Sequence, residues 1–177
     1  MAKNYGKQFE RQVYKNFSEV PGVSVDRIPD QVTRYKGSSS NICDFIVYEM
    51  PILLYLECKT THGASLSISS NPKPDKNGVL HGFYGNIRDN QWNGMLDKCD
   101  IPGVRAGVMI WFVDKDVTMY VPIEVLQEMY AKGIKSINYN YDEWDCDTFC
   151  RHIITIEGKK KRTMFEYDFS DFFRKIK

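Results

Sequence analysis

Two apolar runs with a short break between them form the clearest pattern in the chain. The runs span residues 41–48 and 52–59 and are rich in β-branched and aromatic residues, and a Glu-Met-Pro break separates them at residues 49–51. Runs of this length around a turn predict an antiparallel β-hairpin. Each arm nevertheless carries an acid, Asp44 or Glu57, where an apolar side chain is expected.

The expected register brings these two acids together. A turn centred between Met50 and Pro51 places Asp44 opposite Glu57, and alternation along the strand puts Lys59 on the same face. Opposed like charges destabilise a strand pair. Bound Mg²⁺ would neutralise them, because it takes oxygen ligands and is commonly held by one or two carboxylates. A lysine beside that ion would orient or activate an attacking water, so the pattern indicates a hydrolytic site.

This pattern resembles the core motif of a known nuclease superfamily. Asp44 followed by Glu57-Cys58-Lys59 is similar to the bipartite motif of the PD-(D/E)xK nucleases, which bind Mg²⁺ and cleave phosphodiesters. Within that superfamily the chain looks most like the RecU-type Holliday junction resolvases, over roughly residues 4–131. The closer likeness rests on Gly6-Lys7-Gln8-Phe9-Glu10 in a leading helix, the unbroken spacing from Asp44 to Glu57, and Asn90-Gln91 opening a later helix.

Two departures separate the chain from RecU-type proteins. Those proteins carry a long insertion, the stalk, that helps to grip the junction, and only residues 25–41 stand in its place here. Their usual Thr-Thr-Asp is Ile42-Cys43-Asp44 in this chain. Nuclease chemistry remains the expectation, and junction specificity stays open.

The resemblance implies a fold and a set of ligands. The fold is an α/β one with a restriction-endonuclease-like core, a mixed β-sheet flanked by helices and a C-terminal hairpin extension. Residues 1–177 form a single nuclease domain, with a core at about 4–131 and an extension at about 136–177. Asp44, Glu57 and the backbone carbonyl of Cys58 would hold Mg²⁺, and Glu10 is a further candidate ligand. Mn²⁺ would substitute for Mg²⁺. Lys59 and Gln91 would position the nucleophilic water, and hydrolysis would leave a 5′-phosphate.

The expected function is therefore a Mg²⁺-dependent DNA endonuclease that resolves Holliday junctions or other branched DNA in recombination and repair. Two symmetric nicks need two active sites, so a homodimer is expected, of the kind that a phage carries. A restriction-like endonuclease that cuts linear duplex DNA is an alternative. A non-catalytic DNA-binding or inhibitor protein on the same fold is another, although the intact Asp44, Glu57 and Lys59 argue against it.

Two helices bring further candidates toward this site. Apolar residues recur every fourth position through residues 4–20, which predicts an amphipathic helix with Glu10 at the edge of its apolar stripe. By position Glu10 is either a surface acid or a ligand directed at the sheet. Gln91 shares the spacing of Ile87 and Met95 and so points inward, where a buried amide requires partners.

The rest of the chain alternates strands, loops and helices. Pro122 is expected to begin a helix, because proline is favoured at the first helical position, and Gly158-Lys159 is expected to form the turn of a C-terminal hairpin. The remaining expected segments are strands at 23–30, 65–69, 106–113 and 117–121, loops at 31–41 and 71–85, and a helix at 87–99.

Charge favours DNA contacts only in local clusters, because the formal net charge is +1. Arg34 and Lys36 lie in the loop before Asp44, where they would contact backbone phosphates. Lys159, Lys160 and Lys161 form a second cluster that is either a phosphate contact or a solvated turn.

Three other residue patterns have competing explanations. The five cysteines, with no apolar leader upstream, predict a reducing cytoplasm and free thiols, and Cys146, Cys150 and His152 match no common zinc spacing. Pro29-Asp30 spells the superfamily's "PD" but is not opposite Glu57. His62 is either a general acid, a DNA contact or a bystander.

No run is apolar and long enough to span a bilayer.

Overall fold

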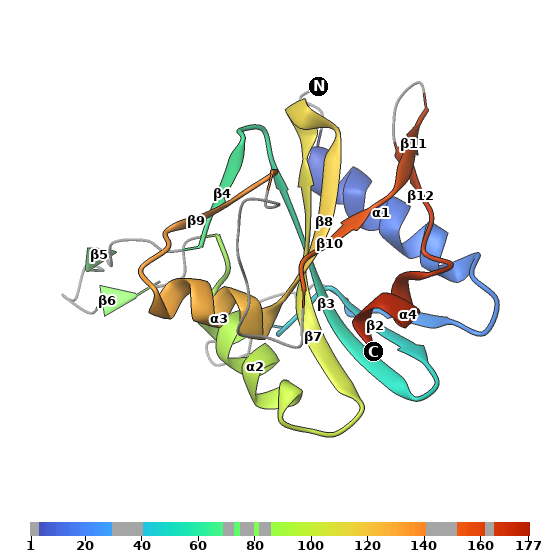
Figure 1. Cartoon of the computed structure of the whole chain (residues 1–177), viewed down its shortest axis with the longest axis horizontal. Helices are drawn as coiled ribbons and strands as arrows, with labels where there is room; N and C mark the ends of the chain where they lie inside the picture. Colours follow the sequence, from blue (N-terminus) through green and yellow to red (C-terminus); the bar gives the residue numbers. More distant parts are fainter. Residues whose placement is uncertain are drawn as a thin grey trace.

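A six-stranded mixed sheet forms the centre of the molecule (Figure 1). The computed structural model describes residues 4–29, 41–68, 73–74, 80–81, 86–140, 152–161 and 165–177. The strand order is β1-β2-β3-β7-β8-β10, in which only β3 and β7 are parallel. The strands are β1 (Ser24–Arg27), β2 (Phe45–Glu49), β3 (Ile52–Thr61), β7 (Val104–Phe112), β8 (Val117–Pro122) and β10 (Ile154–Ile156).

The hairpin of β2 and β3 has the register that the sequence predicts. Phe45 pairs with Leu56 and Glu49 with Ile52, so the turn is centred between Met50 and Pro51. Residues of β3 with even numbers, such as Leu54, are buried against one helical layer, and the odd-numbered ones face the other. The tertiary structure thus confirms which side chains share a face with Glu57.

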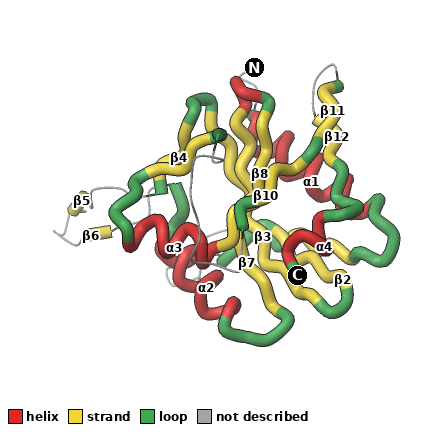
Figure 2. The backbone as a smooth tube through the Cα atoms, in the orientation of Figure 1, coloured by secondary structure: helices red, strands yellow, loops and turns green. Residues whose placement is uncertain are grey.

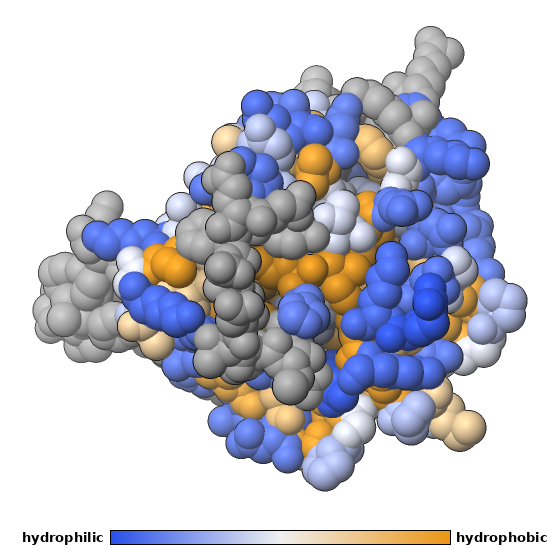
Figure 3. Space-filling model, in the orientation of Figure 1, coloured by the Kyte–Doolittle hydropathy of each residue, from blue (hydrophilic) through white to orange (hydrophobic). Residues whose placement is uncertain are grey.

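Helices cover both faces of the sheet, which confirms the predicted fold class of a mixed sheet flanked by helices (Figures 1 and 2). On one face, α1 (Tyr5–Ser18) packs on β1 and β3, and the Phe172 ring of the short α4 (Phe172–Ile176) contacts Tyr120 of β8 and Phe17 of α1. On the other face, α2 (Asp89–Cys99) and α3 (Ile123–Ala131) pack on β7 and β8, and Trp92 Nε1 donates to Gln127 Oε1 at 2.8 Å. In Figure 3, apolar residues gather near β8 and β10 with hydrophilic residues around them.

Strand β7 is central and buried on both faces, as its continuous apolar run predicts. It leads through the 3₁₀ turn η1 (Val113–Lys115) and Asp116, whose φ is 54°, into β8. Helix α3 begins at Ile123, and Pro122 is its N-cap and the last residue of β8. Proline therefore precedes the first helical residue instead of occupying it.

The C-terminal segment differs from its prediction. Strand β10 pairs with β8 and extends the main sheet, and the hairpin forms between β11 (Gly158–Lys160) and β12 (Phe165–Tyr167). Gly158 and Lys159 consequently lie in a strand and not in the turn. The local sequence was ambiguous here, because a Gly-Lys pair fits both a turn and a strand. Side chains after β12 enter the core, where the Phe169 ring stacks on Phe17 of α1 at 3.9 Å between ring centroids.

Two pairs of short strands lie outside the main sheet. Strand β4 (Ser65–Ser67) pairs with β9 (Ser136–Asn138), and β5 (Lys73–Pro74) pairs with β6 (Leu80–His81). Most of the loop predicted at 71–85, and nearly all of the one at 31–41, lies outside the described residues. In the part of the chain that is described, none of the helices has the length and apolar character needed to cross a membrane.

Gly107 allows β8 to approach β7. A Cβ added at Gly107 would lie 2.5 Å from the Val121 carbonyl oxygen and 2.6 Å from the Tyr120 ring. Overpacking a core typically costs 1–3 kcal/mol. We expect Gly107→Ala to lower the free energy of unfolding by about 3 kcal/mol, measured by urea denaturation. Gly63→Ala is the matched control, because its Cβ would meet nothing closer than 3.8 Å; equal losses in the two variants would contradict the prediction.

Candidate active site

Strand β3 carries the centre of the site. Glu57 and Lys59 project from the face that α2 covers, and the Lys59 ammonium donates to Glu57 Oε1 at 2.6 Å. The Glu57 side chain is 3% exposed and that of Lys59 is 20% exposed. The alternation of side chains along a strand puts both residues on one face, which the sequence predicted.

Asp44 lies just before β2 and reaches the same place. Its backbone N–H donates to the carbonyl of Leu56 at 3.1 Å, although Leu56 is the register partner of Phe45, so Asp44 contacts β3 one residue out of register. Its carboxylate Oδ2 accepts a hydrogen bond from the Cys58 backbone N–H at 2.8 Å. Asp44 is therefore bound to Leu56 and Cys58, the residues of β3 on either side of Glu57.

Helix α2 supplies Gln91. Its side chain is buried, and its Oε1 accepts from Lys59 Nζ at 3.4 Å and from the Arg88 backbone N–H at 3.2 Å. The inward direction predicted from the spacing is confirmed. The structure thus brings Asp44, Glu57, Lys59 and Gln91 together from three separate elements.

The environment opposes ionisation of both acids. Burial raises the pKa of Glu57 to about 7, the Lys59 ammonium opposes this rise, and the charge of Asp44 adds to it. Burial also raises the pKa of Asp44, against the hydrogen bond from Cys58 N–H, and the charge of Glu10 raises it further. The two buried carboxylates repel each other, and the single Lys59 ammonium compensates only part of their charge.

The residues present fit a hard divalent cation. Glu57 Oε2 is buried and has no hydrogen-bond partner, so one carboxylate oxygen is free for a ligand. Among the described residues, no three His, Cys, Asp or Glu side chains form a group that could hold a metal. An ion here would therefore depend on two carboxylates, backbone oxygen and water, a donor set that Mg²⁺ accepts.

Glu10 is near the site but already has partners. Its Oε2 accepts from Lys7 Nζ at 3.0 Å and from Arg27 Nη2 at 2.8 Å, and its side chain is 14% exposed. Its charge contributes to the raised pKa of Asp44, so Glu10 lies within electrostatic reach. The sequence offered no signal for Arg27, a lone arginine in a short strand. Whether Glu10 binds metal remains a prediction.

The DNA-binding candidates whose side chains are described, Lys159 and Lys161, do not join this cluster. Arg34 and Lys36 lie outside the described residues, as do Asp30 and the side chain of Lys160. Lys159 and Lys161 are exposed on the hairpin of β11 and β12, where Lys161 Nζ lies 2.8 Å from Glu166 Oε2.

His62 follows β3 and contacts other exposed groups. Its Nδ1 lies 3.1 Å from Asp114 Oδ1, and its ring meets the edge of Tyr5 at 4.8 Å between centroids. None of these contacts involves the acids, so the structure leaves the role of His62 open.

The cysteines that are described are free thiols, as predicted. Burial raises the pKa of Cys43 to about 12 and that of Cys58 well above its usual value, so both remain protonated near neutral pH. Cys146 and Cys150, the two cysteines of the zinc alternative, lie outside the described residues.

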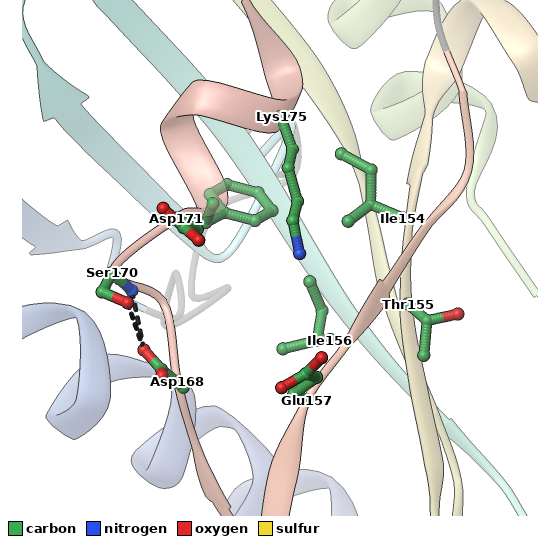
Figure 4. Close-up of a pocket in the computed structure, with 9 residues that line it drawn as sticks. Ile154, Thr155, Ile156, Glu157, Asp168, Ser170, Asp171 and Lys175 are labelled. Carbon is green, nitrogen blue, oxygen red and sulfur yellow. Dashed lines mark hydrogen bonds between the residues drawn. The ribbon is translucent and has the colours of Figure 1, made fainter.

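A separate pocket lies between β10 and the C-terminal helix (Figure 4). Lys175 extends into it toward Ile156 and Glu157. Asp168 accepts hydrogen bonds from Ser170 N and Oγ at 3.0 and 2.7 Å, which lower its pKa. None of the predicted site residues lines this pocket, and its polar side chains are exposed.

Comparisons with known proteins leave the family open. No protein-family model matches the chain, and none of the curated proteins matches it. Among solved structures, the chain is similar to Hjc of Archaeoglobus fulgidus, a Holliday junction resolvase from an archaeal hyperthermophile. The TM-score is 0.43 at 16% identity, and the match covers 67% of this chain and 78% of Hjc. A likeness of this extent carries no argument for function, which must rest on the geometry of the site.

The raised pKa of Glu57 predicts a pH dependence of stability in the absence of metal. Between pH 4.5 and about 7 the folded protein holds a proton that the unfolded chain has lost, so stability falls as pH rises through this window. At ~1.4 kcal/mol per pKa unit, Glu57→Gln should stabilise the protein at pH 8 by on the order of 3 kcal/mol. Urea denaturation with EDTA measures this difference.

Near pH 4.5 the same substitution should have little effect, because Glu57 is then neutral in the folded protein. Glu19→Gln, at an exposed site, is the control at both pH values. If Glu57→Gln stabilised the protein as much at pH 4.5 as at pH 8, ionisation of Glu57 would not be the cause of the stability difference.

Proposed function

We propose that the chain is a Mg²⁺-dependent DNA endonuclease of RecU-like type that acts on branched DNA as a homodimer. The observation that carries the proposal is the buried carboxylate of Glu57, which has one oxygen without a partner and lies with Asp44, Lys59 and Gln91. A burial of this kind costs several kcal/mol unless a cation compensates it.

Each residue has a definite task in this proposal. Asp44 and Glu57 would hold the ion with the Cys58 carbonyl and water, and Glu10 would join them only if its carboxylate moved toward the ion from Lys7 and Arg27. When bound, the ion neutralises charge on the scissile phosphate and makes a water more acidic. The Lys59 ammonium, now paired with Glu57 Oε1, orients the attacking water and stabilises negative charge as it develops on the phosphate.

Gln91 supports Lys59 in this arrangement. Its Oε1 receives hydrogen bonds from Lys59 Nζ and from Arg88 N–H, so it restricts where the ammonium lies. A fixed ammonium and a fixed pair of carboxylates define the line along which water approaches the phosphorus. As the resemblance to the PD-(D/E)xK nucleases implies, hydrolysis would leave a 5′-phosphate.

The first test uses labelled four-way junction, fork and linear duplex DNA, each with Mg²⁺ and with EDTA. The proposal expects Mg²⁺-dependent nicking of the junction in preference to linear duplex. Sequence-specific cutting of linear duplex would instead favour the restriction-like alternative. Binding without cleavage in every metal would favour a non-catalytic DNA-binding protein.

Removing either acid should abolish cleavage. Asp44→Asn and Glu57→Gln each remove a negative charge from the metal ligands, so we expect nicking to fall by more than about 100-fold. Junction binding in Ca²⁺, measured by gel shift, should persist. Asp97→Asn and Glu19→Gln are matched controls at exposed sites. Nicking by either acid variant at the rate of the parent protein would defeat the catalytic assignment.

The hairpin lysines should contribute affinity and not chemistry. Lys159 and Lys161 are exposed and lie apart from the acids, so replacing both by alanine should weaken junction binding in Ca²⁺. The slope of log affinity against log salt should fall in magnitude by up to about 2. Lys132→Ala, at the C-cap of α3, is the control. An unchanged salt slope would remove the hairpin from the DNA interface.

A further inference from the structure

Helix α2 contacts the chain immediately before Asp44. Asn90 Nδ2 donates a hydrogen bond to the backbone carbonyl of Asn41 at 3.0 Å. The side-chain Nδ2 of Asn41 in turn donates to the backbone carbonyl of Pro29 at 2.7 Å. Asn41 is therefore tied both to α2 and to the end of the β1 segment. This contact joins residues that are 49 positions apart in the chain.

Gly94, one turn after Asn90, lets the helix approach still closer. A Cβ at Gly94 would lie 2.4 Å from Ile42 Cγ2 and 3.1 Å from Ile42 Cβ. A glycine within a helix costs up to about 1 kcal/mol relative to alanine. The sequence thus contains a residue that weakens α2, at the one turn where Ile42 leaves no room for a side chain.

The same helix also touches the other half of the site. Gln91 follows Asn90 directly and accepts from Lys59 Nζ on β3. Asn90 and Gly94, four residues apart, lie on one face of α2, and Gln91 lies on the adjacent one. Because a helix is stiff, α2 acts as a spacer that relates the segment before Asp44 to Lys59.

Asp44 needs such support because of its charge. Asp44 and Glu57 repel each other across β2 and β3 when both are ionised. Asp44 directly precedes β2, where its N–H donates to Leu56 O and its carbonyl accepts from Ile28 N–H at 2.8 Å, so the direction of its carboxylate depends on where the chain before it lies. Its hydrogen bonds to Leu56 and Cys58 hold it from the side of the sheet, and the contacts of α2 hold the preceding residues.

We propose that Asn90 and Gly94 are positioning residues, which hold the chain before Asp44 so that its carboxylate and that of Glu57 share one cation. This inference rests on the proposed function, since it assumes that these acids bind a divalent ion. In this proposal Asn90 and Gly94 are not themselves ligands of the ion. Their effect passes through Asn41 and Ile42 to the location of Asp44.

Mn²⁺ binding without DNA, measured by calorimetry at pH 8, tests the proposal. We expect Asn90→Ala and Gly94→Ala each to raise the Kd for Mn²⁺ by about 10-fold, as changes to groups that orient ligands do. Asn93→Ala is the matched control, because Asn93 is on the exposed side of the same helix. Its Kd should equal that of the parent protein.

A second substitution separates misplacement from general damage. Ile42→Ala removes the methyl group that a Cβ at Gly94 would meet, so the Ile42→Ala/Gly94→Ala protein should bind Mn²⁺ more tightly than Gly94→Ala alone. If Gly94→Ala does not fold, Asn90→Ala carries the test by itself. In Mg²⁺ nicking assays, Asn90→Ala should raise the half-saturating Mg²⁺ more than it lowers the rate at saturation.

The outcomes distinguish this inference from the proposed function. If the parent protein binds Mn²⁺ and nicks DNA while Asn90→Ala binds Mn²⁺ equally well, the positioning role is overturned and the nuclease stands. Failure of Ile42→Ala to improve binding by Gly94→Ala would overturn the role of Gly94. A parent protein that binds no Mn²⁺ would overturn both the inference and the proposed function.

Discussion

The burial of the Glu57 carboxylate beside Asp44 is the constraint on which the site depends. Taking an ionised acid out of water is costly, and a second acid nearby increases the cost. The Lys59 ammonium compensates one oxygen of Glu57, and the other has no hydrogen-bond partner. A protein that needed only a stable sheet would have an apolar residue at this position of β3, as it has on the same face at Tyr55, which packs against the cluster beneath α2 and α3.

The two helical layers, one on each face of the sheet, explain how such a position arises. Strand β3 lies between β2 and the parallel strand β7, and helices cover both faces. One face of β3 therefore joins the cluster beneath α1, and the other meets α2. At Glu57 and Lys59 that second face becomes polar, and the amide oxygen of Gln91 on α2 accepts a hydrogen bond from Lys59. The site is thus a polar interruption in the packing of α2 on the sheet.

Positive charge is distributed around the acids in two ways. Lys59 lies within the site and pairs with Glu57, whereas Lys7 and Arg27 pair with Glu10 at its edge. Glu10 influences Asp44 through its charge, so the two groups are coupled although no hydrogen bond joins them in the described structure. Binding of a divalent ion would change the balance among all these groups, because each acid would gain a stronger partner than an ammonium.

The sequence alone determined the hairpin and the face on which its acids lie, because the side-chain period of a strand and the position of a turn are local properties. It also determined the inward direction of Gln91, from the period of a helix. Only the tertiary structure decided which groups meet these acids. The pairing of Glu10 with Arg27, the close approach of Gly94 to Ile42 and the bond from Asn90 to Asn41 join segments distant in the chain. The C-terminal turn was misplaced for the same reason: β10 pairs with β8, and that pairing is not encoded in the local pattern around Gly158.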